Sequence, residues 1–91
     1  MMTVRLHMSK LLRAAADNQE TVAVKGKTIG ECLQDLVSQY PDVNSLLFDE
    51  KGTVRRYVMI FLNQKNTYPE EMNVPVKHGD NIHLEYFVDG G

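Results

Sequence analysis

The chain has 91 residues, of which 43% are hydrophobic and 24% are charged, so its size and composition are those of one soluble globular domain. Its longest apolar run, residues 57–62, is far shorter than the roughly 20 residues of a membrane-spanning helix, so we expect no membrane partner. The net charge of −2 arises from 10 basic and 12 acidic residues scattered along the chain, which argues against the basic surface that nucleic-acid binding requires.

Two segments in the N-terminal part, residues 3–8 and 20–25, alternate between polar and apolar side chains, which predicts two half-buried strands. No long apolar segment of the signal-peptide kind accompanies the first strand, so we expect a cytoplasmic protein. Residues 9–19 are long for a hairpin loop, and we predict one turn of helix within them. The inward-facing strand positions are Val4, Leu6, Met8, Val22 and Val24.

The main helix is predicted to begin after Thr28, which forms a capping box with Glu31. In that motif the Thr28 hydroxyl accepts from the Glu31 amide, while the Glu31 carboxylate accepts from the Thr28 N–H. Pro41 disfavours helical geometry at the preceding residue and ends the helix. The apolar side chains recur at helical spacing and define the buried face, at Ile29, Cys32, Leu33, Leu36, Val37 and Tyr40.

Cys32 is the single cysteine, so neither an internal disulfide nor a paired-cysteine zinc site is available. Its thiol suggests two interpretations, a persulfide carrier or an inert core side chain. We favour the core side chain, because Cys32 lies on the apolar face of the predicted helix and buried thiols there are normally unreactive.

The middle of the chain is predicted to contain an irregular segment over residues 43–47 that covers one edge of the core. Residues 49–52 supply turn chemistry, with Gly52 available for positive φ. The following segment, 54–63, is rich in β-branched and aromatic residues and almost wholly apolar in its second half. That pattern is typical of a strand covered on both faces, so we predict a central position in the sheet.

The C-terminal part is predicted to turn at 63–66, to run irregularly over 68–76, to turn again at 78–81 and to end in a strand from Ile82. Alternation places Ile82, Leu84, Tyr86 and Val88 on one face and His83, Glu85 and Phe87 on the other. His7 and His83 are both expected to face outward. No third ligand with suitable spacing accompanies them, so we predict no metal site.

One amphipathic helix joining strand pairs predicts an α+β domain of β-grasp type, with a mixed sheet of four to five strands packed on one main helix. In this arrangement the first and last strands lie side by side. We expect the domain to cover residues 1–88 and a flexible C-terminal tail to cover 89–91.

Three sequence features, taken in order, resemble the MoaD/ThiS family of ubiquitin-like sulfur carriers. They are the run FDEKGTVRRYV at residues 48–58, leading into FLN at 61–63, then VKHGDNI at 76–82, and finally Gly90-Gly91. Within the family, the acidic turn followed by Arg-Arg-Tyr is most similar to the longer carriers associated with cysteine biosynthesis.

The resemblance implies a working cycle in which the C-terminal carboxylate of Gly91 is converted to a thiocarboxylate. An E1-like adenylyltransferase would activate it with ATP, a sulfur donor or sulfurtransferase would supply sulfur, and a sulfur-accepting synthase would receive sulfide. The chain would then be a protein co-substrate, not an enzyme, with no cofactor of its own. Gly90, Asp89 and Phe87 are the candidate partner-binding residues beside Gly91.

The two terminal glycines suit this chemistry, because a Cβ at either position would obstruct a tail that threads a narrow channel to the α-phosphate of ATP. Asp89 departs from the family pattern, since many carriers have a small neutral residue there. Its carboxylate would meet like charge from the phosphates, so we expect a partner enzyme to supply a compensating Arg or Lys.

Several alternatives stay open on the sequence alone. The chain has features of a molybdopterin synthase small subunit, of a ubiquitin-like protein modifier and of a β-grasp interaction domain whose tail has no chemical role. Phe87 has two interpretations, an exposed docking anchor or a side chain covered by neighbouring elements. Arg5, Arg55 and Arg56 fit either contacts to an acidic partner or a solvated strand edge, and we favour the solvated edge.

Overall fold

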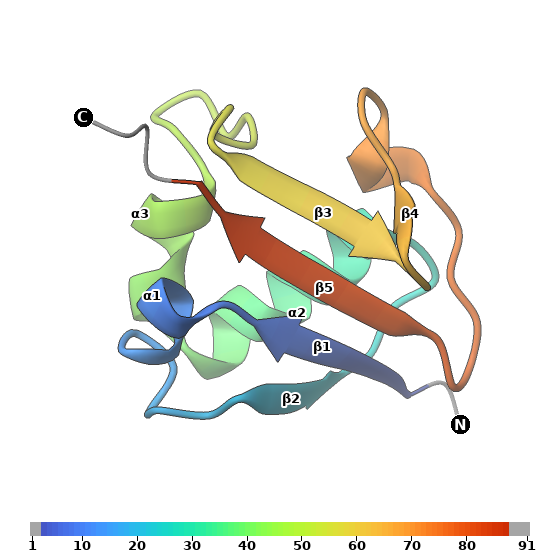
Figure 1. The fold of residues 1–91 in the computed structure, drawn as a ribbon, viewed down its shortest axis with the longest axis horizontal. Coiled ribbons are helices and arrows are strands. Elements are labelled where there is room, and N and C mark those ends of the chain that lie inside the picture. The colour runs from blue at the N-terminus through green and yellow to red at the C-terminus, as the bar shows by residue number, and fades with distance from the viewer. Residues whose placement is uncertain (1–2, 88–91) are drawn as a thin grey trace.

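The computed structural model describes residues 3–87 of the protein. Within them, five strands form one mixed sheet in the order β2-β1-β5-β3-β4 (Figure 1). Strand β5 pairs in parallel with β1, while the remaining neighbours pair antiparallel. This is the expected β-grasp topology, with the first and last strands side by side. The bounds are β1 Val4–Met8, β2 Thr21–Val24, β3 Val58–Leu62, β4 Lys65–Asn66 and β5 Asn81–Tyr86.

Helix α2, Ile29–Gln39, crosses one face of this sheet, as Figure 1 shows. The predicted helical turn after the first strand is also present, as α1, Lys10–Arg13. The segment predicted to be irregular is instead helical, in two short pieces, η1 Pro41–Val43 and α3 Asn44–Leu47. A second 3-10 turn, η2 Glu71–Asn73, lies before β5. No helix in the described range 3–87 is long and apolar enough to cross a membrane.

The hydrophobic core lies between α2 and the covered face of the sheet. The inward positions of β1 and β2 are buried as the alternation predicts, and Leu33 and Leu36 of α2 have no exposed surface. Burying an aliphatic side chain completely stabilises the folded state by roughly 1.5–3 kcal/mol, compared with leaving that side chain exposed. Val43 and Leu47, from the short helices, close the core near the C-terminal end of α2.

The capping box of α2 forms only in half. The Thr28 Oγ1 accepts from the Glu31 amide at 3.2 Å, as expected, but the Glu31 carboxylate accepts from the Lys27 amide at 2.9 Å instead of the Thr28 amide. The reason is tertiary, because Lys27 and Ile29 are both bonded to the segment before β5. That pairing holds residues 27–29 extended and presents the Lys27 N–H to the carboxylate.

The prediction for the central strand is wrong in two respects. Strand β3 begins at Val58, not at Val54. Val54 makes only an isolated bridge to Phe48. A turn follows, in which the Val58 amide donates to the Arg55 carbonyl at 2.9 Å. Strand β5, not β3, occupies the middle of the sheet. The apolar second half of the segment misled the prediction, because Phe61 is only partly buried, on the face that the helix does not cover.

The predicted turns are confirmed. Gly52 and Gly79 adopt φ values of +81° and +90°, and Asn63 and Gln64 form a two-residue hairpin loop with φ of 49° and 74°. Asp80 joins two of these turns, since its carboxylate accepts from the Lys77 amide at 2.9 Å and from the Asn63 side-chain amide at 3.1 Å.

Candidate functional site

The C-terminal end of β5 is the part of the described structure that leads to the candidate tail residues. Phe87, the last described residue, donates its backbone N–H to the Tyr57 carbonyl at 2.7 Å. This bond extends the pairing of β5 with the β3 side of the sheet by one residue beyond Tyr86. Three of the predicted site residues, Asp89, Gly90 and Gly91, lie outside the described residues, and so does the predicted boundary at 88.

The Phe87 side chain is 52% exposed. The alternation along β5 therefore predicted its outward position correctly, and neighbouring elements leave about half of it accessible. An accessible aromatic ring offers a large apolar contact at small cost in side-chain entropy, which suits an anchor for a partner. The docking role itself stays a prediction.

An aromatic pair supports the end of β5. The rings of Tyr57 and Tyr86 meet edge to face, with centroids 4.9 Å apart and planes inclined by 60°. Both side chains pack partly buried against the core, and burial is the main reason that the pKa of Tyr86 is raised. The pair joins the loop before β3 to β5, so the C-terminal end of β5 is held by packed side chains and by a backbone bond.

The loop before β3 and helix α3 lie at the same end of the molecule as the C-terminal end of β5 (Figure 1). Arg55 connects them, because its Nε donates to the Ser45 carbonyl at 2.8 Å and its amide donates to the Leu47 carbonyl at 2.8 Å. Arg56 is exposed beside it. Arg5 pairs with Asn81 at the opposite end of β5, so it lies away from Phe87.

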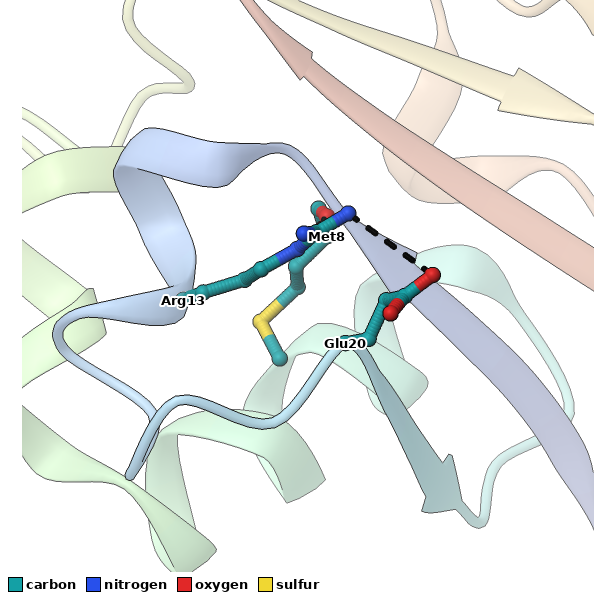
Figure 2. A network of polar contacts seen from close by, with 3 residues as sticks. All are labelled: Met8, Arg13 and Glu20. Atoms are coloured by element: carbon teal, nitrogen blue, oxygen red, sulfur yellow. Dashed lines mark hydrogen bonds and ion pairs between the residues drawn. The ribbon is translucent and has the colours of Figure 1, made fainter.

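A second polar cluster lies between the end of β1 and the start of β2, where the Met8 amide donates to the Glu20 carbonyl at 3.0 Å. Arg13 Nε donates to the Met8 carbonyl at 3.0 Å, and an Arg13 Nη lies 3.9 Å from a carboxylate oxygen of Glu20 (Figure 2). Glu20 is largely exposed, so the ion pair is worth less than about 1 kcal/mol. These contacts fix α1 on the sheet. No sequence signal indicated them, because they depend on how the loop folds back.

His7 and His83 stack on the open face of the sheet, with ring centroids 4.2 Å apart and planes inclined by 5°. His7 Nε2 also lies 2.9 Å from the Asn81 side-chain oxygen. Burial, followed by repulsion from His7, lowers the pKa of His83. Among residues 3–87 no third histidine, cysteine or carboxylate joins them to form a possible metal-binding group.

Cys32 is fully buried within the core, as the sequence predicts. Burial, with smaller contributions from the charges of Asp35 and Glu31, raises its pKa to about 11. A thiol without solvent access and without an ionised form near neutral pH is a poor nucleophile. The persulfide interpretation of Cys32 is therefore not supported by its position.

The comparisons with known proteins point to one family. The sequence model of the ThiS family matches residues 9–91. The sulfur carrier protein CysO of Mycobacterium tuberculosis is 26% identical over 93 residues, which cover 99% of this chain and 100% of that protein.

Two solved structures share the fold over nearly their whole length. The BexX/CysO complex of Amycolatopsis orientalis matches with a TM-score of 0.86 and 24% identity, covering 97% of this chain and 99% of that chain. SAMP1, the small archaeal modifier protein 1 of Haloferax volcanii, matches with a TM-score of 0.87 and 23% identity, covering 98% and 99%. Because the family model spans β5 and nearly all of the other elements, this chain belongs to the ThiS family.

Proposed function

We propose that this protein is a sulfur carrier whose C-terminal Gly91 carboxylate is adenylated and then converted to a thiocarboxylate. Membership of the ThiS family over residues 9–91, with a terminal Gly-Gly pair following β5, is the observation that carries the proposal. The sulfur carrier protein CysO, which is similar over its full length, supports it.

The proposed chemistry explains why the reacting group is a terminal carboxylate. A carboxylate is a poor acyl donor, because its leaving group would be oxide. Attack of the Gly91 carboxylate on the α-phosphorus of ATP releases pyrophosphate and forms an acyl adenylate. Hydrosulfide supplied by a sulfur donor then attacks the acyl carbon and displaces AMP, which leaves –COSH for transfer to an acceptor.

Catalysis in this scheme belongs to partners: an E1-like adenylyltransferase that uses ATP, a sulfur donor or sulfurtransferase, and a sulfur-accepting synthase. The residues of this chain bind the partner enzymes and position the terminal carboxylate. Gly90 and Gly91 leave room for the tail in a narrow channel, Phe87 offers an apolar anchor at the root of the tail, and Asp89 calls for a cationic side chain on the partner. The chain itself acts as a co-substrate in the cytoplasm.

The resemblance to the cysteine-type carriers favours cysteine, or a related sulfur amino acid, as the product that receives the sulfur. A second candidate is a ubiquitin-like modifier, favoured by the similarity to small archaeal modifier protein 1. The two differ in the fate of the activated carboxylate. A carrier releases sulfide, whereas a modifier forms an isopeptide bond with a lysine and appears in higher-mass species that resist thiol reductants.

The test is the intact mass of the protein after co-expression with its E1-like partner and a sulfur source. We expect a gain of about 16 Da, the replacement of one oxygen by sulfur, located on the C-terminal peptide. Removal of Gly91 should abolish the gain without lowering the melting temperature, because a terminal residue contributes almost nothing to core burial. A full-length protein that stays unmodified in the presence of an active partner would contradict the proposal.

A further inference from the structure

Strand β2 forms one margin of the sheet, and no helix or strand of residues 3–87 lies beyond it (Figure 1). Its other side pairs with β1. Ala23 and Lys25 are exposed and Thr21 is half-buried, so this margin is open to solvent. The free side of an edge strand presents backbone N–H and C=O groups that another chain can pair with.

The pairing of β1 with β2 shows which backbone groups point outward. The Met8 amide donates to the Glu20 carbonyl at 3.0 Å, so the even-numbered residues of this segment direct their polar groups toward β1. The amides and carbonyls of Thr21 and Ala23 therefore point away from the sheet.

Helix α2 already covers one end of this edge. The Ala23 carbonyl accepts from the Gln39 side-chain amide at 3.1 Å, and the Lys25 amide donates to the Asp35 carboxylate at 2.9 Å. Among the hydrogen bonds of residues 3–87, none includes the Thr21 amide, the Thr21 carbonyl or the Ala23 amide. Three outward groups are therefore available to a guest strand, and each belongs to a residue with exposed surface.

The occupied Ala23 carbonyl selects the direction of the guest. A guest parallel to β2 meets the three groups with two alternate residues. The first accepts from the Thr21 amide, and the second donates to the Thr21 carbonyl and accepts from the Ala23 amide. An antiparallel guest would instead direct one of these N–H groups at the Ala23 carbonyl, which Gln39 already occupies. The next facing residue of the parallel guest would meet the same carbonyl, so a proline, which has no N–H, fits there.

Opposite charges lie at the two ends of the edge, on the open face of the sheet. Glu20, which precedes β2, lines a hollow together with His7 and His83 of that face. Its side chain is 76% exposed, and the nearest Arg13 Nη, at 3.9 Å, is too far to form a charge-assisted hydrogen bond with it. Lys25, which follows β2, falls on the same face by alternation and has no ion pair within the described range 3–87.

We propose that the outer edge of β2 accepts an extended segment of a partner protein as a parallel strand. This segment carries a basic residue that meets Glu20 and, four residues later, an acidic residue that meets Lys25. A second copy of this chain is a poorer guest, because two β2 edges pair symmetrically only in the antiparallel direction. Centred on Thr21, that pairing brings the two Glu20 carboxylates together. Centred on Val22, it requires the Ala23 carbonyls that are already occupied.

The site is separate from the end of β5 and goes beyond the proposed sulfur chemistry. Neighbouring strands are about 4.8 Å apart, and β1 and β2 lie between β5 and the guest, so the guest would lie roughly 14 Å from β5. A strand added at β2 therefore leaves Phe87 exposed. Binding at this edge does not depend on any reaction of Gly91, so each proposal can fail without the other.

The probe is the capped hexapeptide Thr-Lys-Val-Thr-Pro-Glu, titrated into the full-length isotope-labelled protein and followed by nuclear magnetic resonance. Its valine is the residue that bonds to both Thr21 and Ala23, and its proline faces the occupied carbonyl. We expect saturable shifts at residues 21–23 with a Kd of about 1 mM or below. At saturation, hydrogen exchange of the Ala23 amide should slow by about tenfold or more, while that of Val22, whose N–H faces β1, should stay unchanged.

Two control peptides separate strand addition from charge attraction. N-methylation of the valine removes the donor to the Thr21 carbonyl and should weaken binding at least about tenfold. Exchange of the lysine and the glutamate keeps the composition, reverses the order of the charges and should weaken binding by a similar factor. On the protein, Lys25→Glu should weaken binding of the original peptide about tenfold, whereas Lys65→Glu, exposed on β4 at the opposite edge, should change it less than about twofold.

The proposal is overturned by an absence of saturable shifts, by equal binding of either control peptide, or by equal binding to the Lys25→Glu variant. Shifts at residues 21–23 that grow with protein concentration in the absence of peptide would assign the edge to a second copy and would overturn the proposal as well.

Discussion

Cys32 illustrates at the residue scale how burial controls chemistry. Its pKa of about 11 leaves on the order of one thiolate per thousand molecules at pH 8, and the side chain has no exposed surface. We predict that iodoacetamide at pH 8 leaves the folded protein unlabelled and labels it rapidly in denaturant, as measured by intact mass. Fast labelling of the native protein would show that the core around α2 opens readily.

His83 provides a pH prediction at the same scale. Its pKa is lowered from the ordinary value of 6.5, first by burial and then by the nearby His7, while Glu85 acts in the opposite direction. The unfolded chain therefore takes up a proton at this side chain more readily than the folded one. Its contribution to stability is complete above pH 6.5 and is lost as the pH falls through 6.5 toward the folded pKa.

We predict that the free energy of unfolding falls between pH 7.5 and pH 5.5, and that His83→Gln reduces this fall. Urea denaturation of the two proteins at both pH values measures the difference. His78→Gln, at an exposed histidine away from the stacked pair, serves as the control and should keep the fall of the parent protein. Identical pH dependence of the parent and the His83 variant would contradict the prediction.

At the scale of elements, Gly30 allows helix α2 to approach η2. A Cβ at this position would lie 2.8 Å from the Met72 carbonyl oxygen, which is backbone and cannot rotate away. Alanine favours a helix over glycine by about 1 kcal/mol, so local propensity alone predicts stabilisation by Gly30→Ala. We predict the opposite, a net loss of about 1–3 kcal/mol, because overpacking forces the two elements apart.

Thermal and urea unfolding of Gly30→Ala test this prediction. Ser38→Ala, at an exposed position of the same helix, is the matched control and should be neutral or slightly stabilising. A Gly30→Ala protein that is more stable than the parent would show that η2 moves away from α2 at little cost.

At the scale of the whole molecule, Leu36 tests whether the sheet and α2 form one cooperative core. Its side chain is fully buried within the core cluster. We predict that Leu36→Ala lowers the free energy of unfolding by about 2–5 kcal/mol, the usual cost of lost burial and of the cavity left behind. Gln34→Ala, exposed on the same helix, should change it by less than about 0.5 kcal/mol.

Urea denaturation followed by circular dichroism and by tyrosine fluorescence provides the measurement. The two signals should change together, because a domain of this size unfolds as one unit. An unchanged midpoint for Leu36→Ala would mean that the buried face of α2 is assigned wrongly, and separate transitions would mean that the sheet persists without the helix.

The features predicted correctly from the sequence are local. The faces of β1 and β2 and the buried face of α2 follow from side-chain period, because water exclusion acts on each element in the same way wherever it lies in the fold. The burial of Cys32 follows for the same reason, whereas the positive φ of Gly52 follows from its place in a turn and its lack of a Cβ. At the candidate site, alternation along β5 sufficed to predict that Phe87 is exposed, whereas Asp89, Gly90 and Gly91 stay predictions.

Features that depend on long-range pairing were decided only by the tertiary structure. The central place of β5 and the stacking of His7 on His83 join residues far apart in the chain. The Glu31 carboxylate accepts from the Lys27 amide because Lys27 itself pairs with the distant segment before β5. The sequence of a strand specifies which side chains are buried, but its backbone can pair with almost any neighbour. Which neighbour a strand pairs with depends on how the whole core packs. The pattern of residues by itself therefore determined which faces of the elements are buried. Only the packed domain determined the order of the strands in the sheet.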